Sequence, residues 1–234
     1  MSTMQPDFNA LQQQLKVSFR DVDLLKQAFV HRSYLNENPG FPLGHNERLE
    51  FLGDAVIELV VTEYLFQRYP NPEGELTNWR AALVNAKMLA QIAGRLALEP
   101  YLFLSRGEAA DTQGKARQYI LANAFEAVIG AIYLDGGYTP TKEFLERCLL
   151  PELPRILADQ LYYDPKSRFQ EAAQDFLGIT PTYQVLSERG PDHAKHFTVG
   201  VYVGDELVVE GEGSSKREAQ EQAAARGLEV KGWE

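Results

Sequence analysis

Residues 118–134 are the stretch that most limits what this chain can fold into. The segment reads Gln-Tyr-Ile-Leu-Ala-Asn-Ala-Phe-Glu-Ala-Val-Ile-Gly-Ala-Ile-Tyr-Leu, and nearly every side chain in it is apolar. A helix that is apolar on all sides is stable in water only when other elements cover it. We therefore expect a central, buried helix in a helical core, with Gly130 and the neighbouring alanines allowing a second helix to approach closely.

Two polar side chains of this helix, Asn123 and Glu126, share one face at positions i and i+3. A buried carboxylate without a partner is costly, so Glu126 needs one. A cation shared with other carboxylates, a structural ion pair and a helix–helix hydrogen bond would each satisfy it. The residues alone leave these three possibilities open.

A second group of carboxylates lies in residues 46–54, Asn-Glu-Arg-Leu-Glu-Phe-Leu-Gly-Asp. Read as a helix, the stretch places Glu47, Glu50 and Asp54 at i, i+3 and i+7, within an arc of roughly 60°. One interpretation is a solvated acidic face near a helix N-terminus, with Asn46 as the N-cap and Glu47 favourable to the helix dipole. The other is a set of carboxylates gathered around a cation.

The other segments of residues 7–158 also have patterns that predict helices, whereas residues 164–234 follow another pattern. We expect helical segments at 7–38 (two helices), 47–69, from an N-cap at Thr77 onwards, 118–134 and 139–158, with a loop at 105–117. His31 is interpreted as a hydrogen-bonded structural histidine. Residues 159–163 predict a short linker. Residues 164–234 then predict a helix, three alternating strands with a Gly204-Asp205 hairpin turn, and an alanine-rich helix, the order αβββα.

Composition narrows the classes of protein to consider. The net charge of −10 has the wrong sign for binding nucleic acid by bulk charge, so any such binding must use local patches. Cys148 is the only cysteine, which excludes an intrachain disulfide and fits a reducing compartment. The first twenty residues lack the order of a signal peptide, and the longest apolar run, Ala127–Leu134, is too short to span a membrane. We expect a cytoplasmic protein with no membrane partner.

The ten residues Asn46–Ala55 closely resemble the signature of the ribonuclease III family, which cleaves double-stranded RNA, and His31-Arg32-Ser33 also resembles the family. The resemblance implies an all-α endonuclease domain at 7–158. It implies an Mg²⁺-dependent enzyme, with Mn²⁺ able to substitute, that leaves 5′-phosphate and 3′-hydroxyl ends. It also implies a homodimer that matures ribosomal RNA precursors and processes structured messages.

Matched residue by residue, the resemblance assigns roles to the two groups of carboxylates. Glu50, Asp54 and Glu126 match metal ligands, and Asp54 and Glu126 match catalytic positions. Asn123 stands at a ligand position that is usually aspartate. Mg²⁺ prefers oxygen ligands and needs only a few carboxylates besides water and substrate phosphate, so the residue types suit it.

The resemblance also assigns three residues outside the metal set. Glu47 and Glu73 match accessory acidic positions near the cleft. Phe51 matches an aromatic that the family places in a pocket of the partner subunit, at a dimer interface that includes the signature helix. The alternative for Phe51 is an ordinary core phenylalanine.

Residues 164–234 resemble a small α+β double-stranded-RNA-binding domain. Three segments carry this resemblance: Arg168-Phe169-Gln170-Glu171, Gly190-Pro191-Asp192-His193 and Gly211–Ala219. It implies RNA contacts by Gln170 and His193 in minor grooves and by Lys216 and Arg217 on phosphates at a helix N-terminus. The alternative for Lys216 and Arg217 is a solvated basic pair.

Two departures leave other functions open. Gln220 stands where family members often carry a basic residue. In addition, eight basic against thirteen acidic residues give 164–234 a net charge of −5. Asn123 supports a rival protein, a double-stranded-RNA-binding regulator with an impaired nuclease domain. A structural ribosome-associated protein is the third possibility.

Overall fold

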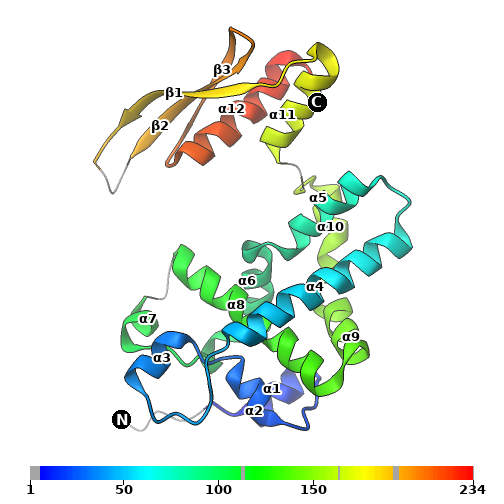
Figure 1. Ribbon diagram of the computed structural model, residues 1–234, viewed down its shortest axis with the longest axis vertical. Coiled ribbons are helices and arrows are strands. Elements are labelled where there is room, and N and C mark those ends of the chain that lie inside the picture. Colours follow the sequence, from blue (N-terminus) through cyan, green and yellow to red (C-terminus); the bar gives the residue numbers. More distant parts are fainter. Residues whose placement is uncertain (1–5, 112–113, 163, 192–194, 234) are drawn as a thin grey trace. The chain divides into compact units, whose positions relative to one another are not determined.

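The computed structural model describes residues 6–111, 114–162, 164–191 and 195–233, which form two compact units, residues 1–162 and 163–234 (Figure 1). The first unit is helical. The second combines two helices with a three-stranded sheet. The predicted fold class, an all-α domain followed by an αβββα domain, is confirmed.

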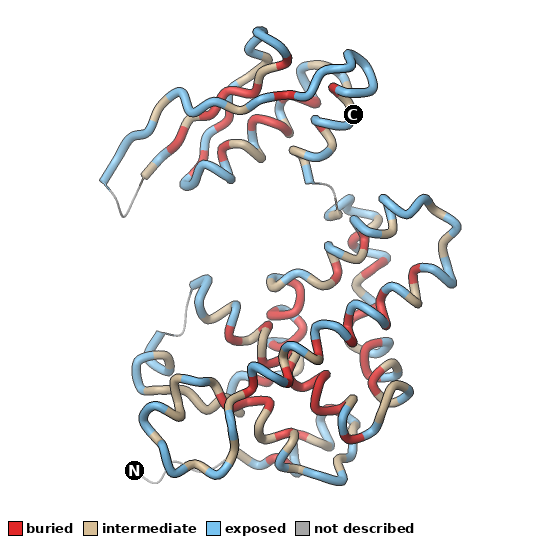
Figure 2. The backbone as a smooth tube through the Cα atoms, viewed as in Figure 1, coloured by how far each residue is buried: buried red, intermediate tan, exposed pale blue. Residues whose placement is uncertain are grey.

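The helices of the first unit surround one core. They are α1 (Phe8–Leu15), α2 (Val22–Gln27), α3 (Arg32–Glu37), α4 (Glu47–Arg68), α5 (Glu73–Val84), α6 (Ala86–Arg95), η1 (Glu99–Tyr101), α7 (Arg106–Ala110), α8 (Lys115–Gly136), α9 (Tyr138–Cys148), η2 (Leu150–Glu152) and α10 (Leu153–Ala158). Buried residues follow α8 along most of its length, as Figure 2 shows. The sequence predicted this central helix correctly because a helix without a polar face has to be enclosed.

Two glycines set the crossing of α4 and α8. A Cβ atom at Gly53 would lie 1.7 Å from the backbone oxygen of Glu126, and one at Gly130 would lie 2.2 Å from that of Leu49. Only a residue without a side chain fits at either position, so the two backbones touch there. The predicted role of Gly130 is confirmed, and Gly53 is its counterpart on α4.

Several predicted helix boundaries are wrong. Residues 7–38 hold three helices, because α3 follows His31 as a separate short helix. Thr77 is not an N-cap: α5 begins four residues earlier, at Glu73, after Pro72. The expected loop at 105–117 contains α7 and the first turn of α8. These short elements depend on contacts that are distant in the sequence, which local patterns do not reveal.

Asn46 precedes α4 but does not cap it with its side chain. Its amide Nδ2 donates instead to the backbone oxygen of Ala28 (3.1 Å), and its backbone N–H donates to Val30 (2.9 Å). The prediction that the Asn46 side chain caps α4 by a hydrogen bond is therefore wrong. The buried amide thus connects the start of α4 to the segment after α2 by a hydrogen bond.

The second unit has the antiparallel strand order β1-β2-β3, formed by β1 (Thr182–Arg189), β2 (His196–Val203) and β3 (Glu206–Gly213). Gly204 and Asp205 form the predicted hairpin turn, with φ of 62° at the glycine. Helices α11 (Pro165–Leu177) and α12 (Lys216–Lys231) cover one face of the sheet (Figure 1). The predicted alternation of β2 is confirmed, since its apolar residues on that face are buried: Phe197, Val199, Val201 and Val203.

No helix in the described parts of the chain is long and apolar enough to cross a membrane.

Candidate active site

Crossing helices bring together side chains that are about seventy residues apart in the chain. Glu50 and Asp54 project from α4, and Asn123 and Glu126 from α8, on either side of the contact between Gly53 and the Glu126 backbone. The close approach places both helices' polar residues in one region, and the charges of Glu50 and Asp54 act on Glu126. The four predicted metal-site residues are therefore neighbours.

Glu126 is the most perturbed carboxyl of the group. Burial raises its pKa to about 8, and the negative charges of Asp54 and Glu50 push in the same direction. Among the described residues, no basic side chain lies within ion-pair distance of Glu126. A structural ion pair, one of the three partners considered from the sequence, is thus absent from the described part of the chain.

Glu50 lies in a similar but less buried environment. Burial raises its pKa, and Glu47 and Asp54 raise it further. The Asn123 side chain acts against this by donating a hydrogen bond to the Glu50 carboxylate. The site thus combines side chains of both helices, with Asn123 of α8 acting on Glu50 of α4.

Glu47 lies at the outer end of the group. Its carboxylate is within 3.5 Å of the Arg32 guanidinium and 3.7 Å of the His45 ring. It is about half exposed, so these pairs contribute little to stability. Glu47 therefore has basic neighbours that Glu126 lacks, and its position at the first residue of α4 is as predicted.

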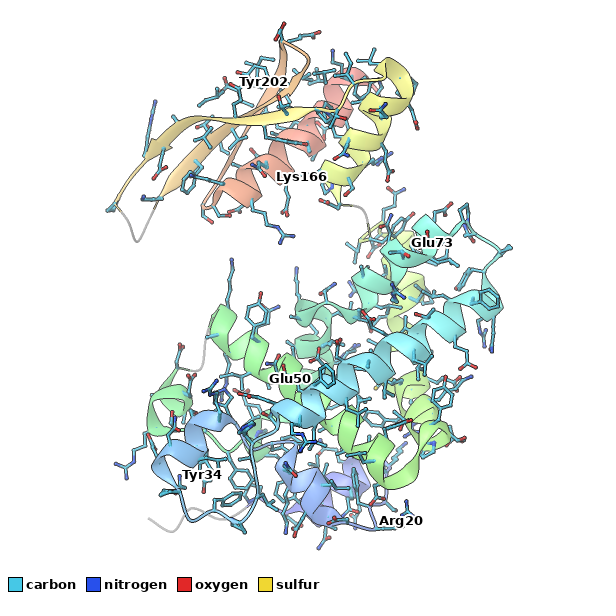
Figure 3. The ribbon with its side chains drawn as sticks, in the orientation of Figure 1. Arg20, Tyr34, Glu50, Glu73, Lys166 and Tyr202 are labelled. Carbon is cyan, nitrogen blue, oxygen red and sulfur yellow. The ribbon has the colours of Figure 1, made fainter. Side chains whose placement is uncertain are left out.

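Glu73 lies elsewhere in the chain's own fold. It begins α5, beyond the C-terminal end of α4, whereas Glu50 is in the first turn of α4 (Figure 3). Eighteen residues of helix between Glu50 and Arg68 amount to about 27 Å. Within one chain, Glu73 therefore does not join the carboxylates at the α4–α8 crossing.

Phe51 is exposed, with 81% of its surface accessible. The alternative of an ordinary core phenylalanine is therefore wrong for the single chain. Leu59 and Phe66, further along α4, are also exposed, at 56% and 79%. Large apolar side chains on one helix that has no cover in its own fold indicate an interaction surface.

A cation fits the chemistry of the crossing, although the described residues do not form a closed cage. No three His, Cys, Asp or Glu side chains in the described ranges converge as a complete set of ligands. Mg²⁺ seldom needs such a set, because it keeps several waters and takes substrate phosphate oxygens. The Glu126 carboxyl is half-buried, lies near the negative charges of Asp54 and Glu50, and has no basic partner among the described residues. This environment suits a hard cation.

His31 has the structural role predicted for it. Its Nδ1 lies 2.7 Å from the Ser33 hydroxyl and accepts from the Ser33 backbone N–H at the start of α3. Burial lowers its pKa, with the carboxylates of Glu108 and Glu47 acting in the opposite direction. The Ser33 hydroxyl also accepts from the Ser105 N–H (3.1 Å), which ties α3 to the segment before α7.

The predicted RNA contacts of the second unit are placed as follows. Gln170 is exposed on α11, and Lys216 and Arg217 are the first two residues of α12, which Ser215 caps. The Arg217 guanidinium pairs with Glu221 one turn further on (2.7 Å). His193 lies outside the described residues.

Sequence reasoning did not assign two residues that shape these sites. Gly53 stands inside the signature stretch. Because it is a small residue between Glu50 and Asp54, it could have suggested a pairing with Gly130 where the helices cross. Lys166 on α11 donates to Gln220 on α12 (2.8 Å), a contact between positions 54 residues apart that no local pattern signals.

Comparison with known proteins agrees with this architecture. Residues 21–153 match the family described as Ribonuclease-III-like, and residues 165–231 match the double-stranded RNA binding motif. A helical nuclease domain followed by such a motif defines a nuclease directed at double-stranded RNA. The chain belongs to the ribonuclease III family and is an endoribonuclease.

Individual relatives match over nearly the whole chain. Ribonuclease 3 of Nitratiruptor sp. is 44% identical over 220 residues, which are 94% of each chain. Ribonuclease 3 of Streptococcus gordonii is 40% identical over 222 residues, covering 94% of this chain and 95% of the relative. The nuclease domain of ribonuclease III from Campylobacter jejuni, in a structure concerned with a region involved in dimer formation, has a TM-score of 0.56 at 39% identity and covers 63% of this chain and 99% of that one.

Proposed function

We propose that this chain is an active, Mg²⁺-dependent endonuclease of double-stranded RNA, with Mn²⁺ able to substitute, that leaves 5′-phosphate and 3′-hydroxyl ends. The observation that carries the proposal is Glu126, whose pKa is raised to about 8 by burial and by Asp54 and Glu50, with no basic partner in the described structure. Carboxyls crowded in this way are typical of functional sites because they need a cation or a proton to offset their charges.

Four side chains would hold the cation. Glu50, Asp54 and Glu126 supply carboxylate oxygens, and Asn123 supplies an amide oxygen if it releases Glu50. A bound Mg²⁺ polarises the phosphoryl group and lowers the pKa of water, which is the chemistry that phosphodiester hydrolysis needs. The α4–α8 crossing fixes the separation of the two pairs of ligands, and Glu47 adds negative charge at the outer end of α4.

We further propose a homodimer that pairs α4 with its symmetry copy. A hollow of about 490 Å³ lies at the C-terminal end of α4, lined mainly by apolar surface from Leu65, Phe66, Tyr69 and Leu76. Phe51 is exposed near the N-terminal end of the same helix. In an antiparallel two-fold pairing, each Phe51 lies at the other chain's hollow, so one symmetric contact buries both copies.

This arrangement gives Glu73 a role that it cannot have within one chain. Glu73 borders the same hollow. When the hollow receives Phe51, Glu73 of the partner subunit approaches the neighbouring residues Glu50 and Asp54. We propose that each catalytic centre is thereby completed by an acidic residue from the second chain, in a cytoplasmic enzyme whose substrates are ribosomal RNA precursors and structured messages.

An RNA cleavage assay tests the proposal. The chain should cut a long RNA duplex when Mg²⁺ is added, and the products should carry 5′-phosphates, shown by their degradation by a 5′-monophosphate-dependent exonuclease. Glu126→Gln should abolish cutting while RNA binding persists. Binding without cleavage at any Mg²⁺ or Mn²⁺ concentration would instead support the second candidate, a double-stranded-RNA-binding regulator, which Asn123 favours.

A further inference from the structure

Lys166 lies at the start of α11 and reaches across to α12. Its ammonium Nζ donates to the Gln220 side-chain oxygen (2.8 Å) and lies 5.2 Å from the centre of the Tyr183 ring. Asp164, the nearest acidic residue in the sequence, is occupied elsewhere. Its carboxylate caps α11 by accepting from the Lys166 backbone N–H and the Ser167 hydroxyl.

Three basic side chains of the second unit form ion pairs with acidic ones. The pairs are Lys195 with Glu188, Arg217 with Glu221 and Lys231 with Glu206. Lys166 and Lys216 differ, because in the described part of this unit neither has a carboxylate within ion-pair distance. In a domain with a net charge of −5, such cations supply the local positive charge that an RNA-binding surface needs.

The two unpaired lysines are held in the same manner and at the same end of α12. The Lys216 ammonium lies 5.8 Å from the centre of the Phe197 ring, as Lys166 lies over Tyr183. Phe197 belongs to one buried cluster with Ala219 in the first turn of α12, and Tyr183 packs against this cluster. An aromatic face orients a cation without neutralising it, so both charges remain available to an anion.

Gln220 determines where the Lys166 charge is presented. Lys216 and Gln220 are four residues apart, so they lie on one face of α12, separated by about one turn. Because the Lys166 ammonium is bound to Gln220, it lies on the face of α12 that Lys216 begins. Two cations without a carboxylate partner among the described residues, from two helices, therefore lie at one end of α12, next to Arg217 with its ion pair to Glu221.

We propose that Lys166 is a phosphate-binding residue of the double-stranded-RNA surface, supplying from α11 the positive charge that position 220 of α12 lacks. A-form RNA presents closely spaced phosphates between successive minor grooves, and cations about one helical turn apart suit them. The inference rests on the proposed binding of double-stranded RNA by this domain. Gln220 is the positioning residue, because it holds the ammonium on that face of α12 without carrying a charge.

The test is RNA affinity as a function of salt, measured with the full chain in metal-free buffer on a blunt RNA duplex of about 24 base pairs. Lys166→Met keeps the apolar stem over Tyr183 and removes the charge. The slope of log affinity against log salt should flatten by about one unit. The loss of affinity should consequently be about three- to fourfold smaller at 200 mM than at 50 mM salt.

Two further variants separate a phosphate contact from a structural role. Lys231→Met is the matched control, because Lys231 ends α12 in an ion pair with Glu206 (3.0 Å), and it should leave the slope unchanged. Adding Gln220→Lys to Lys166→Met returns a cation to the same place from the other helix and should restore both slope and affinity. Thermal unfolding should show the same midpoint for the two single variants.

The outcomes distinguish this inference from the proposed function. If Lys216→Ala with Arg217→Ala flattens the slope by about two units while Lys166→Met leaves it unchanged, RNA binding stands and the role of Lys166 is wrong. If Gln220→Lys fails to rescue Lys166→Met, the charge does not act at position 220 and the inference is also wrong. If the wild-type chain does not bind the duplex, both proposals are overturned.

Discussion

Gly53 of α4 and Glu126 of α8 meet backbone to backbone: a Cβ at position 53 would lie 1.7 Å from the Glu126 carbonyl oxygen. Contact of this kind leaves no freedom in the separation of the two helices. The same contact positions the side chains of the site, because Glu50 and Asp54 lie on either side of Gly53 in α4 and Glu126 supplies the contacting backbone in α8.

Gly53→Ala should therefore separate α4 from α8. Overpacking a tight contact costs about 1–3 kcal/mol, and more where backbone is the obstacle, so we expect at least this loss in the free energy of unfolding. The rate of cleavage should fall by more than the loss of folded protein accounts for, because the proposed metal ligands move apart. Gly94→Ala is the control: nothing lies within 4 Å of a Cβ there, and the substitution should be neutral or slightly stabilising in urea unfolding.

The sequence predicted the grouping of these carboxylates better than the boundaries of the elements around them. Helical spacing alone places Glu47, Glu50 and Asp54 on one face, and the apolar surroundings of Glu126 demand a partner. By contrast, Asn46 has every feature of an N-cap, yet its amide binds the backbone of Ala28, eighteen residues away. Local patterns describe local hydrogen bonds, and they fail where a distant partner holds the side chain in another orientation.

The exposure of Phe51 is a second case in which sequence alone was insufficient. A phenylalanine in an apolar helix is compatible with a core or an interface, and only the packing of the whole unit distinguishes them. Glu73 is a third case, because it lies at the opposite end of α4 from Glu50 within one chain. Its predicted place near the cleft depends on a second copy of the chain, which no pattern within one sequence specifies.

Asp135 provides a prediction about folding stability and pH. It is buried at the C-terminal end of α8, and burial alone would raise its pKa, but hydrogen bonds from the backbone N–H groups of Arg20 and Asp21 outweigh burial and lower it. Asp135→Asn should cost about 1–3 kcal/mol at neutral pH, because it weakens these hydrogen bonds in a buried place.

The pH dependence follows from the direction of that shift. The folded-state pKa is below the unfolded value, so the stabilisation by Asp135 is fully present above the unfolded pKa and is lost as pH falls through the folded pKa. Urea unfolding should show the gap between wild type and Asp135→Asn narrowing below about pH 4. Asp23→Asn, at an exposed pair with Lys26, should show only a small effect. A gap that stayed constant down to pH 2 would contradict the ionised role of Asp135.

Phe51→Ala should weaken the dimer and leave the folded monomer intact. Because 81% of the side chain is exposed in the single chain, its removal creates no cavity there. An aromatic that fills a partner's hollow is typically worth 2 kcal/mol or more, so the dimer dissociation constant should rise by at least about 30-fold. Val230→Ala, at an exposed apolar position on α12, is the control. Sedimentation of the wild-type chain as a monomer at micromolar concentration would contradict the dimer.

Binding of Mg²⁺ without RNA should depend on pH through Glu126. With a pKa of about 8, this carboxyl is mostly protonated at neutral pH in the metal-free chain, and a cation must displace that proton. Affinity for Mg²⁺ should therefore increase, by up to about tenfold per unit, as pH rises towards 8, and then level off. Glu126→Gln should remove this dependence in calorimetric titrations.

The raised pKa of Glu126 has the opposite effect on the metal-free chain, because its stability should fall, not rise, with increasing pH. Unfolded Glu126 ionises near pH 4.5, whereas the folded group keeps its proton up to about pH 8. Between these values the folded state binds more protons, so the free energy of unfolding should decline as pH rises through this range. Added Mg²⁺ should reverse the decline. A stability that is insensitive to both pH and Mg²⁺ would place the cation elsewhere.

Asn123→Asp is the substitution that decides how the site is used. The amide donates a hydrogen bond to Glu50 and so stabilises the ionised form of that carboxylate. Aspartate would replace the donor with a fourth carboxyl group beside Glu50, Asp54 and Glu126. In the metal-free chain the pKa values of Glu50 and Glu126 should rise further and stability should fall, whereas the attraction for a cation should increase.

We expect the wild-type chain to bind its cation with weakened affinity. It should therefore cleave RNA only at higher Mg²⁺ concentrations. Changes near metal ligands typically alter affinity by about 10–100-fold. Asn123→Asp should thus lower the Mg²⁺ concentration for half-maximal cleavage by at least about tenfold, or roughly 1.4 kcal/mol. Asn123→Ala, which loses both the hydrogen bond and the amide oxygen, should raise that concentration. If wild type and Asn123→Asp cleave alike, position 123 is not a ligand. If only Asn123→Asp cleaves, the asparagine inactivates the nuclease, and the chain acts by binding RNA.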